Sequence, residues 1–109
     1  MLDDTDVSIL KEVHNSKGDY TTTSLAKKIF NAESPYELKI KENFVRGRLF
    51  RLMDLGLITA TPENGRRVSF TIHKSLIFAK GDLVINRRVV CKGNFLICNI
   101  KGLTYCIGF

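Results

Sequence analysis

The sequence has no tryptophan, only two prolines in 109 residues, and no apolar run long enough to cross a bilayer. A membrane-spanning helix needs about 20 predominantly apolar residues. The acidic start "MLDDTDVSIL" also differs from a signal peptide, which begins basic and then turns apolar. With 44% hydrophobic and 26% charged residues, the composition is that of a folded, soluble chain. We therefore expect a cytoplasmic protein with one domain, or a small domain with an appendage.

Close pairs of metal ligands and recognisable catalytic motifs are also missing. The three cysteines, Cys91, Cys98 and Cys106, form no Cys-x-x-Cys pair, and the two histidines, His14 and His73, are far apart. This spacing predicts buried, reduced cysteines, no metal and no cofactor, although an odd thiol could still pair between subunits. No glycine-rich phosphate loop, paired carboxylates or nucleophile motif is present. We expect a protein that is not an enzyme.

Acidic residues are scarce in the second part of the chain. Residues 39–109 hold thirteen Lys and Arg against four Asp and Glu, a net charge of +9, whereas residues 1–38 have a net charge of −3. A basic region of this size attracts polyanions, so nucleic acid is the first candidate partner and an anionic membrane surface the second. A merely solvated basic surface is the plain alternative.

Apolar spacing predicts two short helices in the first thirty residues. In residues 6–18, Asp6 stands where an N-cap is wanted and Gly18 is a natural stop. In residues 20–30, a threonine run supplies the cap and both lysines face outward. The apolar positions that define these two helices are Val7, Leu10 and Val13, then Leu25, Ala26 and Ile29.

A longer amphipathic helix is predicted to begin after Ser34. Ser34-Pro-Tyr-Glu37 is a Ser-x-x-Glu capping box with proline at the first helical position, and Gly56 ends the pattern. Residues 31–34 then form the preceding turn. Leu38, Val45, Leu49 and Leu52 fall on one apolar stripe. The first turns are less clearly helical, because "LKIK" alternates like a strand and Ile40 lies off the stripe.

Two β-branched runs, "LITAT" and "VSFTI", flank "PENGRR" and predict a hairpin. Asn64-Gly65 is the strongest short signal for a two-residue turn. Centring the turn there pairs Thr61 with Val68 and Thr59 with Phe70, and places Arg66 and Arg67 at the tip.

The last third is predicted to be a small antiparallel β-meander. "KGDLVIN" and "KGNFLICN" resemble each other, and a third Lys-Gly precedes "LTYCIGF", so turn signals recur between apolar runs. One helix across "SLIFAKGDLVINRRVV" is the alternative, which Gly81 and the β-branched content disfavour.

Three helices followed by a hairpin resemble a winged helix-turn-helix domain of prokaryotic transcriptional regulators, whether bacterial, archaeal or viral. The resemblance rests on "TSLAKKIF", "ENFVRGRLFRLMDLGLI" and "TATPENGRRVSFTI", and covers about residues 5–73. It implies an α+β fold, with residues 74–109 as a β-rich extension that could dimerise or complete the core. It also implies a nucleoid-associated regulator of transcription that binds double-stranded DNA as a homodimer.

The resemblance also implies where DNA would bind. The outward face of the long helix carries Asn43, suited to adenine, Arg46, suited to guanine, and Gly47, which lets the backbone approach closely. Arg48 points toward the core side. Phosphate contacts are expected from the lysines, the wing arginines and the start of the second helix. The full predicted set is Thr22, Thr23, Ser24, Tyr36, Lys39, Lys41, Asn43, Arg46, Arg66 and Arg67.

Each of these residues also has a purely structural interpretation. The arginines could only solvate a helix, Thr22 to Ser24 could only cap one, and Tyr36 and Phe50 could pack against another segment or subunit. A winged-helix adaptor that binds another protein is therefore the second hypothesis. RNA binding is a weaker third, because no strand-borne aromatic signature is evident.

Overall fold

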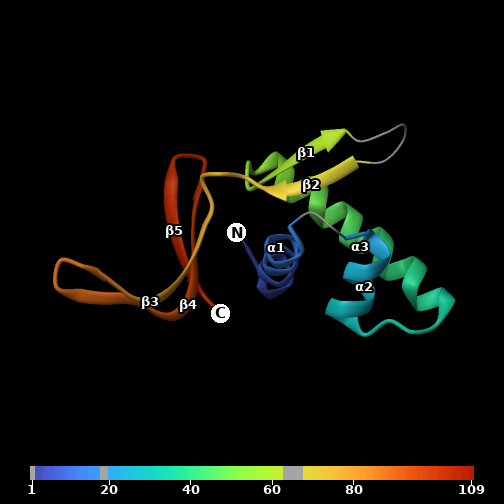
Figure 1. Ribbon diagram of the computed structural model, residues 1–109, viewed down its shortest axis with the longest axis horizontal. Helices are drawn as coiled ribbons and strands as arrows, with labels where there is room; N and C mark the ends of the chain where they lie inside the picture. Colours follow the sequence, from blue (N-terminus) through green and yellow to red (C-terminus); the bar gives the residue numbers. More distant parts are fainter. Residues whose placement is uncertain (1, 18–19, 63–67) are drawn as a thin grey trace. The chain divides into compact units, whose positions relative to one another are not determined.

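The computed structural model describes residues 2–17, 20–62 and 68–109, which fold as an α+β protein. The chain divides into two compact units, Met1–Ile72 and His73–Phe109. Three helices and a two-stranded antiparallel sheet make up the first unit, and a three-stranded antiparallel sheet makes up the second (Figure 1).

Helix α1 (Asp4–Ser16) begins one turn earlier than predicted. Its N-cap is Asp3, which accepts a hydrogen bond from the Asp6 backbone N–H at 2.8 Å, and Asp6 accepts one from the Asp3 N–H at 3.1 Å. The prediction of Asp6 as the N-cap was wrong, because this reciprocal capping box satisfies two backbone donors instead of one. The helix ends at Ser16, followed by the C-cap Lys17 at φ +53°, and the predicted stop at Gly18 lies outside the described residues.

Helices α2 (Thr22–Phe30) and α3 (Pro35–Asp54) are joined by the predicted turn over residues 31–34. Asn31 ends α2 in the left-handed conformation, and Ser34 caps α3 by accepting the Glu37 N–H at 3.1 Å. The predicted capping box is only half formed, because the Glu37 carboxylate accepts the Glu33 N–H instead of the Ser34 N–H. The "LKIK" segment is helical, and Ile40 is exposed.

The apolar stripe of α3 supplies the centre of the first unit's core. Val45, Leu49 and Leu52 are almost fully buried. Gly56, at φ +78°, then turns the chain, and the Leu57 N–H reaches back to the Leu52 carbonyl at 3.0 Å. With the Gly56 N–H bonded to the Met53 carbonyl at 2.9 Å, this is a Schellman ending, and Leu52 and Leu57 are both buried. The remaining buried apolar residues of this unit are Val7, Ile9, Leu10, Val13, Leu25, Ala26, Ala32, Leu57, Ile58 and Phe70.

Strands β1 (Ile58–Pro62) and β2 (Val68–Ile72) pair antiparallel, one residue out of the predicted register. Ala60 pairs with Phe70, and Ile58 pairs with Ile72. A register change of one residue moves a side chain to the other face of a sheet. The observed register gathers these four apolar residues on one face, whereas the predicted one would have paired Phe70 with Thr59. The five residues between the strands, including Asn64-Gly65, lie outside the described residues.

Strands β3 (Ile77–Ile85), β4 (Arg88–Ile100) and β5 (Leu103–Gly108) form the predicted antiparallel meander. Its two turns, at Asn86-Arg87 and Lys101-Gly102, each place both central residues at positive φ, as tight hairpin turns require. The helical alternative for this segment was wrong, because β-branched residues and recurrent glycines favour strands. Buried apolar residues in the second unit are Leu76, Phe95, Leu96, Cys98 and Ile100.

A disulfide joins Cys91 on β4 to Cys106 on β5. The prediction of three reduced cysteines was therefore wrong for this pair, and holds for Cys98, which is buried and free. The fold brings the two Cα atoms to 6.8 Å, within the range that a disulfide can span. Spacing along the chain did not reveal the pair, and strand pairing would not have done so either, because Cys106 pairs with Ile97, six positions from Cys91. Disulfides are rare in cytoplasmic proteins, so the cysteines no longer support the expectation of a cytoplasmic location.

Candidate functional site

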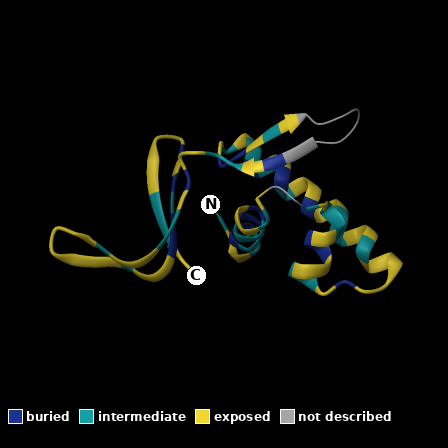
Figure 2. Cartoon of the chain, in the orientation of Figure 1, coloured by how far each residue is buried: buried dark blue, intermediate teal, exposed yellow. Residues whose placement is uncertain are grey.

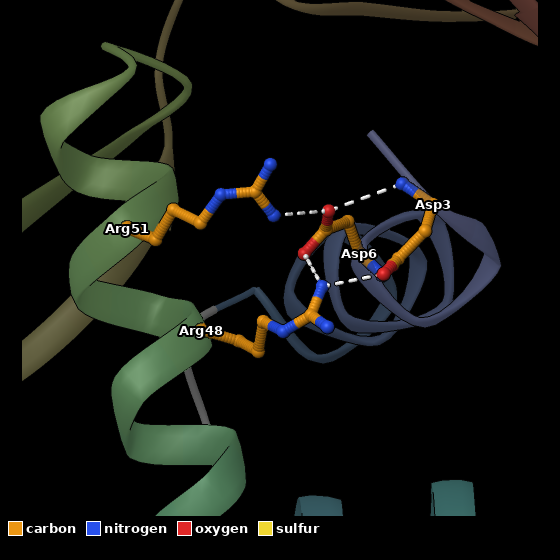
Figure 3. A network of polar contacts seen from close by, with 4 residues as sticks. All are labelled: Asp3, Asp6, Arg48 and Arg51. Carbon is orange, nitrogen blue, oxygen red and sulfur yellow. Dashed lines mark hydrogen bonds and ion pairs between the residues drawn. The ribbon is translucent and has the colours of Figure 1, made fainter. Parts of the chain in front are cut away.

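Two arginines of α3 point inward and bind the start of α1 (Figure 3). Asp6 has no exposed surface, and its carboxylate accepts hydrogen bonds from Arg48 at 3.0 Å and Arg51 at 2.8 Å. Arg48 also contacts the Asp3 carboxylate at 2.6 Å. A buried carboxylate is tolerated when charged donors satisfy it in this way. These two arginines serve the fold, and Arg48 lies on the core side as predicted.

The same network shifts two ionisation equilibria. The Asp3 carboxylate accepts a hydrogen bond from the Asp6 backbone N–H and another from the Arg48 guanidinium. Both lower the pKa of Asp3 below its ordinary value. The carboxylates of Asp3 and Asp6 raise the pKa of Arg48. Both shifts favour the charged forms, so the ion pairs persist at neutral pH.

The opposite face of α3 is exposed, as the helical wheel predicts (Figure 2). Asn43, Arg46 and Gly47 lie there without cover from the rest of the described chain. Arg46 donates a hydrogen bond to the Asn43 Oδ1 at 3.0 Å, so the two side chains are held together one helical turn apart. The guanidinium keeps its other donors for an external acceptor. Tyr36, Lys39 and Phe50 lie on the same exposed face.

Lys41 was predicted to contact a DNA phosphate, and in the structure it lies against an aromatic ring. Its ammonium lies 4.7 Å from the centroid of the Phe30 ring, and the residue is half-buried. Such a cation–π contact holds the charge at the border between α2 and α3. Lys39 is exposed whereas Lys41 is half-buried, so the two predicted lysines differ in their surroundings.

The hydroxyls at the start of α2 are already engaged within the unit. Ser24 exchanges capping hydrogen bonds with Thr21, and Thr23 donates to the Glu42 carboxylate at 2.7 Å. Glu42 places a negative charge beside the positive end of this helix, where phosphate binding was expected. Thr22 is half-buried in the first turn. The contact between Glu42 and Thr23 is not evident from the sequence, because nineteen positions separate the two residues.

Four large apolar residues of α3 are also exposed, and they fall into two kinds. Phe44 and Phe50 make edge-on ring contacts with Phe30 and Phe70, at centroid distances of 5.6 and 5.9 Å. Within the described chain, no ring contact of this kind covers Tyr36 or Ile40, and Tyr36 is the most exposed of the four.

The two predicted wing arginines, Arg66 and Arg67, lie outside the described residues. Across the described ranges, no group of three or more His, Cys, Asp and Glu side chains gathers as a metal site would require. None of the helices in these ranges combines the length and the apolar character needed to cross a membrane.

Comparison of the chain with protein-family models, with curated proteins and with solved structures gives no match.

Proposed function

We propose that the first unit is a winged-helix DNA-binding domain, and that the protein is a transcriptional regulator. In this proposal α3 enters the major groove of double-stranded DNA, and the β1–β2 hairpin is the wing beside it. Three helices, the turn between α2 and α3, and an antiparallel hairpin support the assignment of this architecture. The exposed polar face of α3 supports the assignment of function.

Gly47 is the observation that carries the proposal. It lies in the middle of a 20-residue helix, where glycine costs about 1 kcal/mol relative to alanine. Packing does not require it, because no described atom lies within 4 Å of the Cβ that an alanine would add. A surface that must approach another molecule's backbone does require a small residue. The glycine stands one turn from Asn43 and beside Arg46, so its place on the helix fits a contact face.

The chemistry of this face suits a DNA groove. An α-helix fits the major groove, where guanine presents two acceptors to an arginine fork. The hydrogen bond between Arg46 and Asn43 orients both side chains before binding, which limits the rotamer entropy that binding would remove. Because Asn43 already accepts from Arg46, the pair presents mainly donors, so we expect guanine to be preferred over adenine at the contacted position.

We further propose that the protein binds DNA as a homodimer. One module of this kind contacts only a few base pairs, and two half-sites supply the missing specificity. The second unit, whose strands expose apolar residues, could supply the contact between the two copies.

The proposal is tested by titrating the full chain and its variants into fluorescent duplex DNA. Gly47→Ala should raise the free energy of unfolding by about 0.5 to 1 kcal/mol and still weaken binding. The double variant Asn43→Ala with Arg46→Ala should lose sequence preference, at a cost of about 1 to 3 kcal/mol. Lys28→Ala is the matched control, because Lys28 is exposed on α2 and pairs with Glu12. Unchanged binding by both α3 variants would refute the assignment of the contact face.

The test of DNA contact by the wing uses Arg66→Ala together with Arg67→Ala. This variant should weaken binding to every duplex alike and reduce the salt dependence, because phosphate contacts carry no sequence information.

A protein-binding adaptor is the second candidate function, and one observation favours it. Tyr36 is 76% exposed and Ile40 is 47% exposed, four residues apart on α3. Residues at this spacing share one side of a helix and could dock into an apolar groove on a partner. If the wild-type chain binds no duplex at low salt, this function replaces DNA binding as our proposal.

A further inference from the structure

Part of the second unit projects beyond its three-stranded sheet (Figure 1). Strand β5 pairs with β4 only over Phe95–Ile100, whereas β3 and β4 continue to pair as far as Ile85 and Arg88. Residues 81–93 are therefore a two-stranded ribbon with no third strand. We call residues 81–93 the arm. An isolated two-stranded ribbon is marginally stable in water, so this one must gain stability from its attachment or from a partner.

The arm meets the sheet at a pair of glycines. Gly81 and Gly93 face each other across the strands, and both have positive φ, at +127° and +80°. Glycine adopts this backbone without strain, so the pair permits a bend at the base of the arm. The Cys91–Cys106 disulfide then ties the arm to β5. Closing a loop of this length contributes about 3 kcal/mol in the chain-entropy account.

The arm exposes three valines close to its tip. A β-bulge between Leu83 and Val84 places both Val89 and Val90 opposite Val84. The three valines are 50 to 55% exposed, whereas Leu83 and its partner Cys91 are half-buried. Exposed β-branched side chains in a ribbon are typical of a surface that contacts another molecule.

The tip of the arm is cationic. Arg87 and Arg88 are exposed, and neither forms an ion pair with any residue in the described ranges. Arg87 occupies the second turn position at φ +64°, where glycine would be the favoured residue. The whole second unit holds six Lys and Arg and a single acidic residue, Asp82. Charge of one sign on this scale attracts a polyanion.

We propose that the arm is a second DNA contact, separate from α3, in which the ribbon lies in a groove of the duplex. A two-stranded ribbon fits the major groove, where apolar side chains contact thymine methyl groups. Arg87 and Arg88 would bind phosphates, and the three valines would contact apolar atoms of sugars and bases. This inference rests on the proposed function of DNA binding.

A second copy of the chain fits the arm less well. Two arms packed on their valines would bring cationic surfaces together. Three half-exposed valines also offer far less than the roughly 800 Å² per partner of a standard protein interface. Charge complementarity therefore favours DNA, and self-association through the arm is an outcome of the test below.

The test compares the salt dependence of DNA binding for variants of the full chain. Arg87→Gly with Arg88→Thr removes both tip charges, and it places the favoured residue in the turn and a β-branched residue in the strand. The slope of log affinity against log salt should fall by about 1.8, which is about 0.9 for each lost phosphate contact. Lys74→Ser with Lys101→Asn removes two other exposed charges of the same unit and should keep the wild-type slope.

A second variant separates apolar contact from charge. Val84→Thr with Val89→Thr and Val90→Thr keeps the side-chain shape and should weaken binding about tenfold, with the slope unchanged. The inference is overturned if the arginine variant keeps the wild-type slope, or if the lysine control loses as much slope. It is also overturned if the valine variant keeps the wild-type DNA affinity and only converts a dimer into a monomer in sedimentation. Absence of any binding by wild type would instead overturn the proposed function.

Discussion

At the scale of single residues, Asp6 determines which arginines of α3 are left to bind another molecule. Its buried carboxylate holds Arg48 and Arg51 on the inner side of α3, while Arg46 is left on the outer side. The helical wheel predicted the inward direction of Arg48. It could not predict the partner, because 42 positions separate Arg48 from Asp6 and only the packing of α1 on α3 brings them together.

The buried carboxylate should be important for stability. Asp6→Asn keeps the volume and removes the charge, so the hydrogen bonds from two arginines weaken. We expect the free energy of unfolding to fall by about 2 to 3 kcal/mol, the range for a charged hydrogen bond that is lost in the interior. Denaturant unfolding measures the change. Asp4→Asn, an exposed residue in the same turn, should change stability by less than about 1 kcal/mol. Equal effects of both variants would show that the network is not needed.

Asp3 predicts how stability depends on pH. Its pKa is lowered in the folded state, so its contribution is fully present above the unfolded value of about 3.9 and is lost as pH falls through the folded value. Asp3→Asn retains a good N-cap and removes the charge. The stability gap between wild type and this variant should therefore shrink as unfolding is measured at successively lower pH. A gap that stays constant down to acid pH would contradict the assigned shift.

At the scale of elements, local signals located most helices and strands. Apolar spacing and caps predicted α2 and α3 within a residue or two, since these patterns reflect short-range geometry. The register of β1 and β2 was missed by one residue. Burial of Phe70 and Ile58 on one face decides that register, and the Asn64-Gly65 turn signal carries no information about burial.

Gly56 is the glycine whose conformation the fold requires. At φ +78° it ends α3 and lets Leu57 bond back to Leu52. Gly56→Ala should lower the free energy of unfolding by about 1 to 2 kcal/mol, because an L-residue is strained in the left-handed region. Thermal unfolding checks this, with Gly47→Ala as the matched control of opposite sign. If both alanine variants shifted stability in the same direction, the distinction between the structural and the contact glycine would be lost.

At the scale of the whole molecule, positive charge is divided between the two units. The first unit holds eleven Lys and Arg against ten Asp and Glu, and Asp6 of α1 pairs with Arg48 and Arg51 of α3. The second unit has a large excess of Lys and Arg. Composition predicted a basic half of the chain. It could not predict that some of those charges are neutralised internally while the tip of the arm is left exposed, because pairing depends on the fold.

The central claim is that this chain binds double-stranded DNA, and one titration tests it most directly. Fluorescence anisotropy of a mixed-sequence duplex of about 30 base pairs, roughly three turns, is followed as the full chain is added at about 50 and 200 mM salt. Our account predicts saturable binding at the lower salt and a loss of affinity of at least about tenfold at the higher salt, because phosphate contacts release counterions. No rise in anisotropy at the lower salt would contradict it.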